Sequence, residues 1–365
     1  CIESDPESFG PTDPADLNLP SIGLNAIPGT KTVTRTVTAV DKYRRRQNPN
    51  HPDYQKGGGE PGKSVPVLYR AEVEAPEGCS VDVVPSRFYL APGESATYEV
   101  TVTSENATPN EWAFGALTWK TSLGYDGRSP IAVNSVAFIS ADEVDSAGAS
   151  GTAQFDITFG YTGEYTAQVH GLNEAGVFLT PPLADDPDDE FAFLLDDPAT
   201  FFAVYRDVEP GTAFRRWSMD GQFQAAGDDF DMYLYYCPEL SCTQIASSAA
   251  AGSTESVDVL LPIPFDATID NPYVLFIHAF DTESVEPTGA FFFDNSFGIV
   301  DDAGNLSASA PETAVTGETA PITIEWEGLN VGPGVKYLGA ISHSDANGIQ
   351  NLTIIDIQND NVVAE

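Results

Sequence analysis

The most constraining feature of this sequence is a strictly alternating run near its start. In TVTRTVTAV (32–40) threonine occupies every second position, and TYEVTVT (97–103) shows the same alternation. Successive side chains of a β-strand point to opposite faces, so Val33 and Val37 are placed toward a core and the threonines on the other, half-buried face. The run therefore predicts a regular β-strand.

The same kind of pattern recurs along the whole chain. Helical periodicity is nearly absent, and short alternating runs are bounded by Gly, Pro, Asn and Asp. The expected strands of the first third are 31–40, 67–74, 80–84, 87–91, 96–103, 113–119 and 129–134, and later ones lie near 201–206, 230–236, 256–260 and 273–280. Since 365 residues exceed what one core usually serves, the sequence predicts an all-β fold of tandem β-sandwich domains, three in number.

Charge and hydropathy exclude several partners. Fifty-five acidic residues against sixteen basic ones give a net charge of −39, which repels nucleic acid phosphates and anionic lipid headgroups. Such a surface suits either a secreted protein in salty water or simple solubility. No stretch approaches the ~20 apolar residues of a membrane span. The start of the chain has neither a basic nor an apolar signal region, so we expect a mature, extracellular piece.

Four cysteines are present. Cys237 and Cys242 in CPELSC have too few neighbouring ligands for a zinc site, so a local disulfide is expected. Closing so small a ring stabilises the fold by roughly 2 kcal/mol in an oxidising compartment. Cys1 pairs either with Cys79 or with a cysteine from sequence that once preceded the chain, and the sequence leaves both open.

Catalytic signals are missing from the sequence. A Ser-His-Asp triad needs a histidine within reach of an activated serine, yet none of the four histidines lies in a recognisable motif, and no G-x-S-x-G elbow occurs. The interpretation is that this chain is not itself an enzyme.

Two acidic segments and a row of aromatics are candidates for binding. Asp228, Asp229 and Asp231 lead into a strand, where hard oxygen ligands suit Ca²⁺, the only cofactor expected; the alternative is an acidic turn. DDPDDE (185–190) is read as a solvated linker, with a metal or a basic partner as alternatives. The tyrosines of DMYLYY (231–236) either pack on the sheet or line a face that holds a polymeric protein or polysaccharide.

The basic residues concentrate in one loop, 41–64. Its interaction candidates are Arg44, Arg45, Arg46, Lys56 and Lys63. Glycine and proline in the loop favour a flexible, solvated surface segment. The alternative is a charged contact with an acidic surface, on a protease domain, a substrate or a second copy of the chain, which the arginines would bind in bidentate pairs.

A series of ordered motifs carries a family resemblance. The motifs are DLNLPSIGL (16–24), GTKTVTRTVTAV (29–40), YRAEVEAPEGCSVDVVPSRFYLAPGESATYEVTVT (69–103), FGALTW (114–119) and RSPIAV (128–133). Together they resemble the fibronectin type III-like domain that follows the catalytic domain of subtilisin-like serine proteases, the cucumisin-like branch and its bacterial relatives. The inserted loop 41–64 and Cys79 depart from that pattern. Both departures would alter the local packing or the partners of the domain.

The rest of the chain resembles, more loosely, the C-terminal extension of bacterial secreted subtilases. DDFDMYLYY (228–236) is similar to a strand of pre-peptidase C-terminal-type β-domains. The resemblance implies an extended segment at 1–22, a fibronectin type III-like domain at 23–137, a pre-peptidase C-terminal-like sandwich at 138–283 and an immunoglobulin-like or jelly-roll sandwich at 284–365, completed by strands from 151–172.

The implied function is that of a non-catalytic accessory region. It would stabilise or position a protease catalytic domain in cis, or attach it to substrate or surface. The alternative is a processed fragment that acts as a self-assembling structural or adhesive protein, a homo-oligomer joined head to tail through the N-terminal segment and Arg44 to Arg46.

Overall fold

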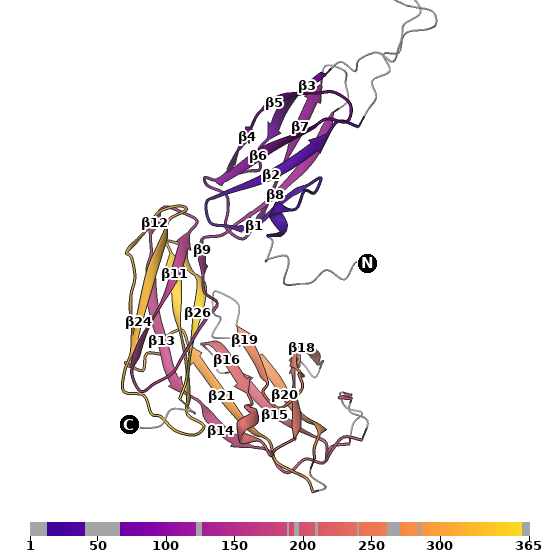
Figure 1. Ribbon diagram of the computed structural model, residues 1–365. Helices are drawn as coiled ribbons and strands as arrows, with labels where there is room; N and C mark the ends of the chain where they lie inside the picture. Colours follow the sequence, from indigo (N-terminus) through magenta and orange to yellow (C-terminus); the bar gives the residue numbers. More distant parts are fainter. Residues whose placement is uncertain are drawn as a thin grey trace, which may run out of the picture. The chain divides into compact units, whose positions relative to one another are not determined.

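The computed structural model of the protein describes residues 13–40, 66–121, 126–187, 190–192, 197–208, 211–238, 241–260, 271–283 and 286–359. Within these residues, regular structure consists of β-strands and two short 3-10 helices, η2 (Pro14–Asp16) and η3 (Gly221–Phe223). The all-β prediction is confirmed (Figure 1). None of the helices described has the length and apolar character of a membrane span.

The chain divides into two compact units, which are described separately. Unit 1 comprises Cys1–Ile139 with Thr158–Gly163 and Ala314–Thr319, and unit 2 comprises Ser140–Ile157, Glu164–Thr313 and Ala320–Glu365.

Two facing sheets form unit 1. One sheet has the order β1-β8-β7-β3-β5 and the other the order β2-β6-β4. The strands are β1 (Ile22–Ile27), β2 (Thr30–Thr38), β3 (Val67–Glu74), β4 (Cys79–Val84), β5 (Arg87–Leu90), β6 (Ser95–Ser104), β7 (Trp112–Thr121) and β8 (Gly127–Ser135). All seven strands expected in this region are present, with ends shifted by at most two residues.

Alternation explains how unit 1 is built. Val33 on β2 and Val100 and Val102 on β6 are buried in one core with Leu117 and Trp119 of β7. The threonines of β2 lie on the opposite face of the same sheet and are exposed. There, β2 and β6 pair in register, so that threonine hydroxyls meet across the strands. The opening run thus forms an edge strand of the sandwich, with one apolar and one hydroxyl-rich face.

The C-terminal sandwich, as we call it, has two four-stranded sheets, ordered β10-β26-β25-β13 and β22-β24-β11-β9. Its strands are β9 (Phe138–Ser140), β10 (Glu143–Ser146), β11 (Gly151–Phe159), β13 (Thr166–Glu174), β22 (Leu306–Ser309), β24 (Thr319–Trp326), β25 (Lys336–Asp345) and β26 (Gly348–Gln358); β12 (Gly163–Glu164) and β23 (Thr313–Ala314) form a small separate pair. Phe155 of β11 packs edge-on against His343 of β25, which joins the two sheets.

The middle sandwich has sheets ordered β14-β21-β16-β19 and β15-β20-β17-β18. Its strands are β14 (Gly176–Leu179), β15 (Phe201–Val208), β16 (Thr212–Ser218), β17 (Asp229–Tyr236), β18 (Thr243–Ser248), β19 (Ser256–Leu260), β20 (Asn271–Asp281) and β21 (Phe291–Gly298). Phe230, Met232 and Leu234 of β17 point inward and pack with Trp217 of β16 and Phe292 of β21.

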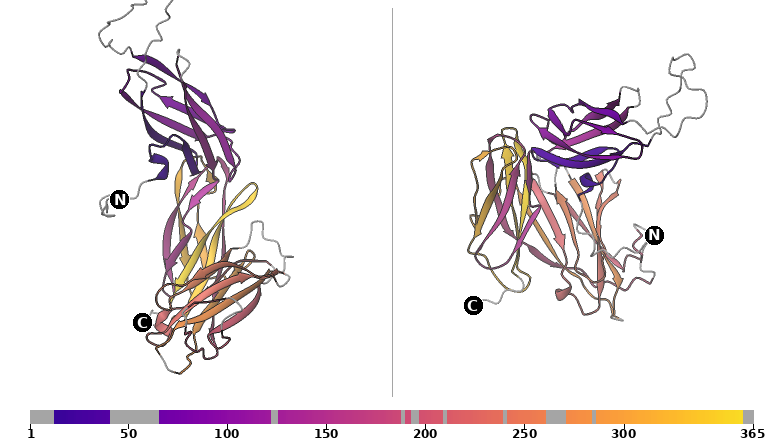
Figure 2. Two further views of the ribbon diagram at one scale, coloured as in Figure 1. Left: turned by 90° about the vertical axis from the view of Figure 1, so that its right-hand side faces the viewer. Right: turned by 45° about the horizontal axis from the view of Figure 1, so that its top comes forward.

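The two sandwiches of unit 2 share a second apolar core. Phe214 of β16 and Phe297 of β21 pack with Leu338 of β25 and with Leu352 and Ile354 of β26. β16 and β21 are therefore buried on both faces. Figures 1 and 2 show these strands next to β26 and β13.

The sheets correct one expected boundary. The sequence placed residues from 284 onward in the last sandwich, but β21 pairs with β14 and β16 of the middle one. Its run FFFDNSFG is buried from both sides and gives no signal of which sheet it joins. β11 and β13, which cover most of 151–172, belong to the sheets of β24 and β25. The remaining domain division stays a prediction.

Candidate functional site

A cleft of about 450 Å³ opens in unit 2 where the edge of the C-terminal sandwich meets the middle sandwich. β10 and β26 contribute Glu143, Asp145 and Asp356 to its lining, and β16 and β21 contribute Arg216 and Asn295. Charged side chains from both sandwiches thus face one another across it.

Arg216 is the centre of the ion pairs in this cleft. Its Nε and Nη2 donate to the two carboxylate oxygens of Asp258 at 2.9 and 2.8 Å, and Nη1 and Nη2 donate to Glu143 at 2.5 and 2.9 Å. Nη1 also donates to Asp356 Oδ2 at 2.9 Å. A guanidinium has five N–H groups, so Arg216 uses all of them on three carboxylates.

Burial and hydrogen bonding shift the pKa values of two groups in this network, Arg216 and Asp356. Burial works against the charge of Arg216, but the hydrogen bonds to Asp258 and Glu143 outweigh it and raise its pKa. Burial also raises the pKa of Asp356, although Arg216 acts in the opposite direction, and the charge of Glu143 adds to the rise. The positive charges of Arg216 and Lys336 therefore do not fully offset the effect of burial on the Asp356 pKa.

An acidic group lies on the same face of the β10–β26 pair. The strands are parallel, and Asp145 lies directly opposite Asp356. Glu143, two residues before Asp145, points to that face as well. One oxygen from each of the three carboxylates lies within 4.8 Å of the other two, a spacing that could hold a metal ion.

Asn295 faces the same cleft from the middle sandwich. It lies directly opposite Arg216 in the β16–β21 ladder and is 7% exposed. Its Nδ2 donates to the main-chain oxygen of Asn173 at 2.9 Å, which fixes the orientation of the amide. Among the described residues its buried Oδ1 has no hydrogen-bond partner.

No motif in the sequence indicates this cleft. One signal was available, because Asp356 interrupts the apolar run LTIIDI and an acid in a buried strand needs a partner. The partner, Arg216, is 140 residues away in the chain. No spacing rule connects the two.

Each of the three predicted calcium residues accepts a hydrogen bond through one carboxylate oxygen, and Oδ1 of Asp228 and of Asp229 is buried without a partner among the described residues. Asp228 Oδ2 accepts from Thr288 Oγ1 at 2.7 Å, Asp229 Oδ2 accepts from Gly252 N at 3.1 Å, and Asp231 Oδ2 accepts from the Tyr233 hydroxyl at 3.1 Å. Among the described residues these three do not form a group with oxygens within 4.8 Å of one another. Calcium at this position stays a prediction.

Asp231 belongs to a different cluster on the outer face of the middle sandwich. It pairs in register with His278, whose Nε2 lies 2.7 Å from Asp186 Oδ2. Burial raises the pKa of Asp231 to about 6, against the hydrogen bond from Tyr233. Asp186 comes from DDPDDE, so the start of that run is packed on the sheet, where Asp185 accepts from Thr282 N at 2.7 Å. These two residues are not the solvated linker that the sequence suggested.

Aromatic side chains cover the same outer face. Phe191 stacks on Tyr233 at 4.5 Å between ring centroids and contacts Phe276 at 5.3 Å. Tyr235 and Phe201 complete the cluster, in which Tyr235 is buried. Tyr233 and Tyr235 therefore pack in a secondary core, and a polymer-binding role for them stays a prediction.

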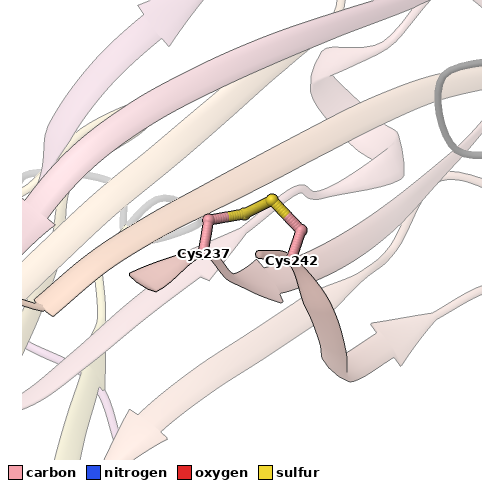
Figure 3. Close-up of a disulfide and its surroundings, with 2 residues drawn as sticks. All are labelled: Cys237 and Cys242. Carbon is pink, nitrogen blue, oxygen red and sulfur yellow. A yellow bond between two sulfur atoms is a disulfide. The ribbon is translucent and has the colours of Figure 1, made fainter. Parts of the chain in front are cut away.

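The expected local disulfide is present beside this cluster. Cys237 and Cys242 are joined at an S–S distance of 2.12 Å between the end of β17 and the start of β18 (Figure 3). Cys79 is half-buried and has no disulfide partner among the described residues, and the pKa of its thiol is raised by burial and by Glu105. Cys1 lies outside the described residues, as do Arg44, Arg45, Arg46, Lys56 and Lys63 of the basic loop.

The histidines that the structure describes have structural partners. His170 Nε2 lies 2.8 Å from Ser342 Oγ, a pairing that resembles a nucleophile and its base, but both residues are 0% exposed. His343 lies 2.8 Å from the Tyr165 hydroxyl and 2.9 Å from Thr353 Oγ1. Burial lowers the pKa of His170, and that of His343 to about 4. Neither can meet a substrate in this structure; His51 lies outside the described residues.

Comparison with known proteins concerns mainly unit 1. Residues 59–133 match the fibronectin type-III domain family. The subtilisin-like protease SBT5.1 of Arabidopsis thaliana is 30% identical over 133 residues, which are 36% of this chain and 15% of the protease. The subtilisin-like serine-protease S of Lotus japonicus is 32% identical over 125 residues, 34% of this chain and 13% of the protease. The chain thus spans about one seventh of the length of these relatives.

The similarity of this chain to solved structures is too low to indicate a function. The secreted serine protease VesC from Vibrio cholerae aligns with 76% of this chain and 48% of its own, at 8% identity and a TM-score of 0.21. What the comparisons show is a fibronectin type III-like region shared with subtilisin-like proteases, in the part of those proteases outside the catalytic domain.

Proposed function

We propose that this chain is a non-catalytic accessory region of a secreted subtilisin-like serine protease. The observation that carries the proposal is the match of residues 59–133 to a fibronectin type-III domain, together with relatives that are proteases many times longer than the matched stretch. The Cys237–Cys242 disulfide supports secretion, because such bonds persist in oxidising compartments. The bacterial origin and the pre-peptidase C-terminal-type extension belong to the same proposal.

The accessory role is to hold a catalytic domain in cis. The five-stranded sheet of unit 1 offers a surface for it, because Trp112 and Phe114 of β7 are 50% and 71% exposed on the face away from the core. Asn134 and Ala132 of β8 lie opposite Trp112 and Phe114 in register, so the two aromatic rings share this face of the sheet. Large aromatic side chains on such a face favour contact with another protein surface.

The test uses the chain alone and the gene that encodes it. The chain should not react with a serine-directed fluorophosphonate probe and should not cleave casein. The coding sequence upstream of Cys1 should specify a subtilisin-like catalytic domain. Labelling of a serine in this chain, or an upstream sequence that encodes no protease, would contradict the proposal.

Aromatic substitutions sharpen the test in the intact protease. The double variant Trp112→Ser and Phe114→Ser should lower the melting temperature of the catalytic domain. A matched double variant on the other sheet, Thr36→Ser and Thr97→Ser, should leave it unchanged. Equal effects of the two variants would rule out docking through this face.

The self-assembling alternative has no support from the described residues. Its main candidates, Arg44, Arg45 and Arg46, lie outside them, and so does the N-terminal segment up to residue 12. It stays a prediction.

A further inference from the structure

The acidic side of the cleft in unit 2 has an excess of negative charge. Glu143, Asp145, Asp258 and Asp356 are gathered around one guanidinium, that of Arg216. Lys336, which also lines the cleft, has its own carboxylate partner, Asp220, at 3.4 Å. Like charges directly across a β ladder destabilise it, and Asp145 and Asp356 are such a pair.

Asp145 accepts no hydrogen bond from Arg216. All five N–H groups of Arg216 are used by Glu143, Asp258 and Asp356. In the part of the chain that the structure describes, Asp145 has neither a hydrogen bond nor an ion pair to its side chain, and it is exposed. The three carboxylates of the β10–β26 face are nevertheless close enough to share one ion.

An independent observation comes from the opposite side of the cleft. Asn295 lines the cleft, and its buried acceptor Oδ1 has no donor among the described residues. The amide cannot be turned over to relieve it without losing the bond from Nδ2 to Asn173. A buried polar atom without a partner is destabilising, so the unpartnered oxygen points to a bound group that an oxygen atom can contact. A cation with its bound water meets that description.

We propose that Glu143, Asp145 and Asp356 bind a Ca²⁺ ion in this cleft, with Asn295 facing the ion or its water shell. Carboxylate and amide oxygens are the ligands that Ca²⁺ prefers, and its flexible coordination accepts a partly solvated site of this kind, whereas Mg²⁺ demands strict octahedral geometry. The ion neutralises the face where the two sandwiches of unit 2 meet. This site is distinct from the one predicted at Asp228, Asp229 and Asp231.

Asp145→Asn is the sharpest variant, because it removes a ligand charge and leaves the Arg216 network intact. The matched control is Asp156→Asn on β11, which is exposed and is not part of the cleft lining. A second comparison variant, Asp229→Asn, addresses the other predicted site. Each full-length chain is stripped with EGTA and titrated with CaCl₂ in 0.1 M NaCl by isothermal calorimetry, with MgCl₂ as the competing ion.

The expected result is that Asp145→Asn weakens Ca²⁺ binding at least tenfold, while the Asp156→Asn and Asp229→Asn chains bind as the wild type does. Calcium should also raise the melting temperature of the wild type and leave that of Asp145→Asn unchanged. No Ca²⁺ binding by the wild type, equal binding by Asp145→Asn, loss of binding in Asp229→Asn alone, or Mg²⁺ binding as tight as that of Ca²⁺ would each overturn the proposal.

Discussion

The interiors of the two units differ in the polar side chains that they bury. In unit 1 the described core is almost entirely apolar, and its one buried charge, Arg35, donates to two main-chain oxygens, of Thr34 and Ala15. In unit 2 buried positions hold three histidines and several carboxylates, and their partners come from distant strands. Unit 1 should therefore depend mainly on apolar burial, and unit 2 also on charge and pH.

The largest expected effect is at Arg216. Replacing it by Met leaves Glu143, Asp258 and Asp356 facing one another without their cation, and breaking a buried ion pair in this way costs about 3–5 kcal/mol. Two experiments at pH 7, urea unfolding and scanning calorimetry, should show that unit 2 is destabilised and that unit 1 is unaffected. The control is Lys120→Met, which breaks the exposed pair with Asp126 in unit 1 and should have no measurable effect. Similar losses in the two variants would contradict the comparison.

The second expected effect is the acid sensitivity that His343 gives to unit 2. Its pKa is about 4 in the folded chain against an ordinary value of 6.5, so the folded state holds the neutral ring. The unfolded chain takes up the proton first, so stability is complete above pH 6.5 and falls as the pH drops toward 4, by roughly 2–3 kcal/mol. In His343→Gln the free energy of unfolding should change less between pH 7 and pH 4.5. A slope as steep as that of the wild type would exclude this role.

Asp231 should make unit 2 less stable as the pH rises, which is the opposite of the effect of His343, and its effect should be smaller. Its pKa of about 6 lies above the ordinary 3.8, so the folded state keeps the proton longer than the unfolded state does. Stability from this group is therefore present at low pH and is lost as the pH rises from 3.8 through 6. Asp231→Asn keeps an acceptor for Tyr233 and should stabilise unit 2 at pH 7 by roughly 1–2 kcal/mol, after allowance for solvent screening.

The Asp231→Asn measurement is made in EGTA and again in CaCl₂. Stabilisation in both solutions would agree with a carboxylate that lacks a cation. A loss of stability that occurs only in CaCl₂ would instead support the calcium site predicted at Asp228, Asp229 and Asp231.

The same contrast explains what the sequence could predict. In unit 1 the alternation of Val and Thr on β2 and β6 specifies the buried face residue by residue, and the predicted strands match. The Cys237–Cys242 disulfide followed from spacing alone. In unit 2, β21 is buried on both faces, so its pattern could not reveal its sheet. The cleft depends on residues as far apart as Glu143 and Asp356, and only the fold brings them together.

The smallest effect is expected on the hydroxyl-rich face of unit 1. Thr36 Oγ1 lies 3.0 Å from Thr97 Oγ1, and both side chains are exposed. Because water can replace this hydrogen bond, Thr36→Ala should change the free energy of unfolding by less than ~1 kcal/mol. Val33→Ala on the same strand is the matched comparison, since it removes buried methyl groups and should cost about 2 kcal/mol. Neither difference should vary between pH 7 and pH 4.5, because no titrating group is involved. A Thr36→Ala loss as large as that of Val33→Ala would mean that the hydroxyl face is covered by another surface.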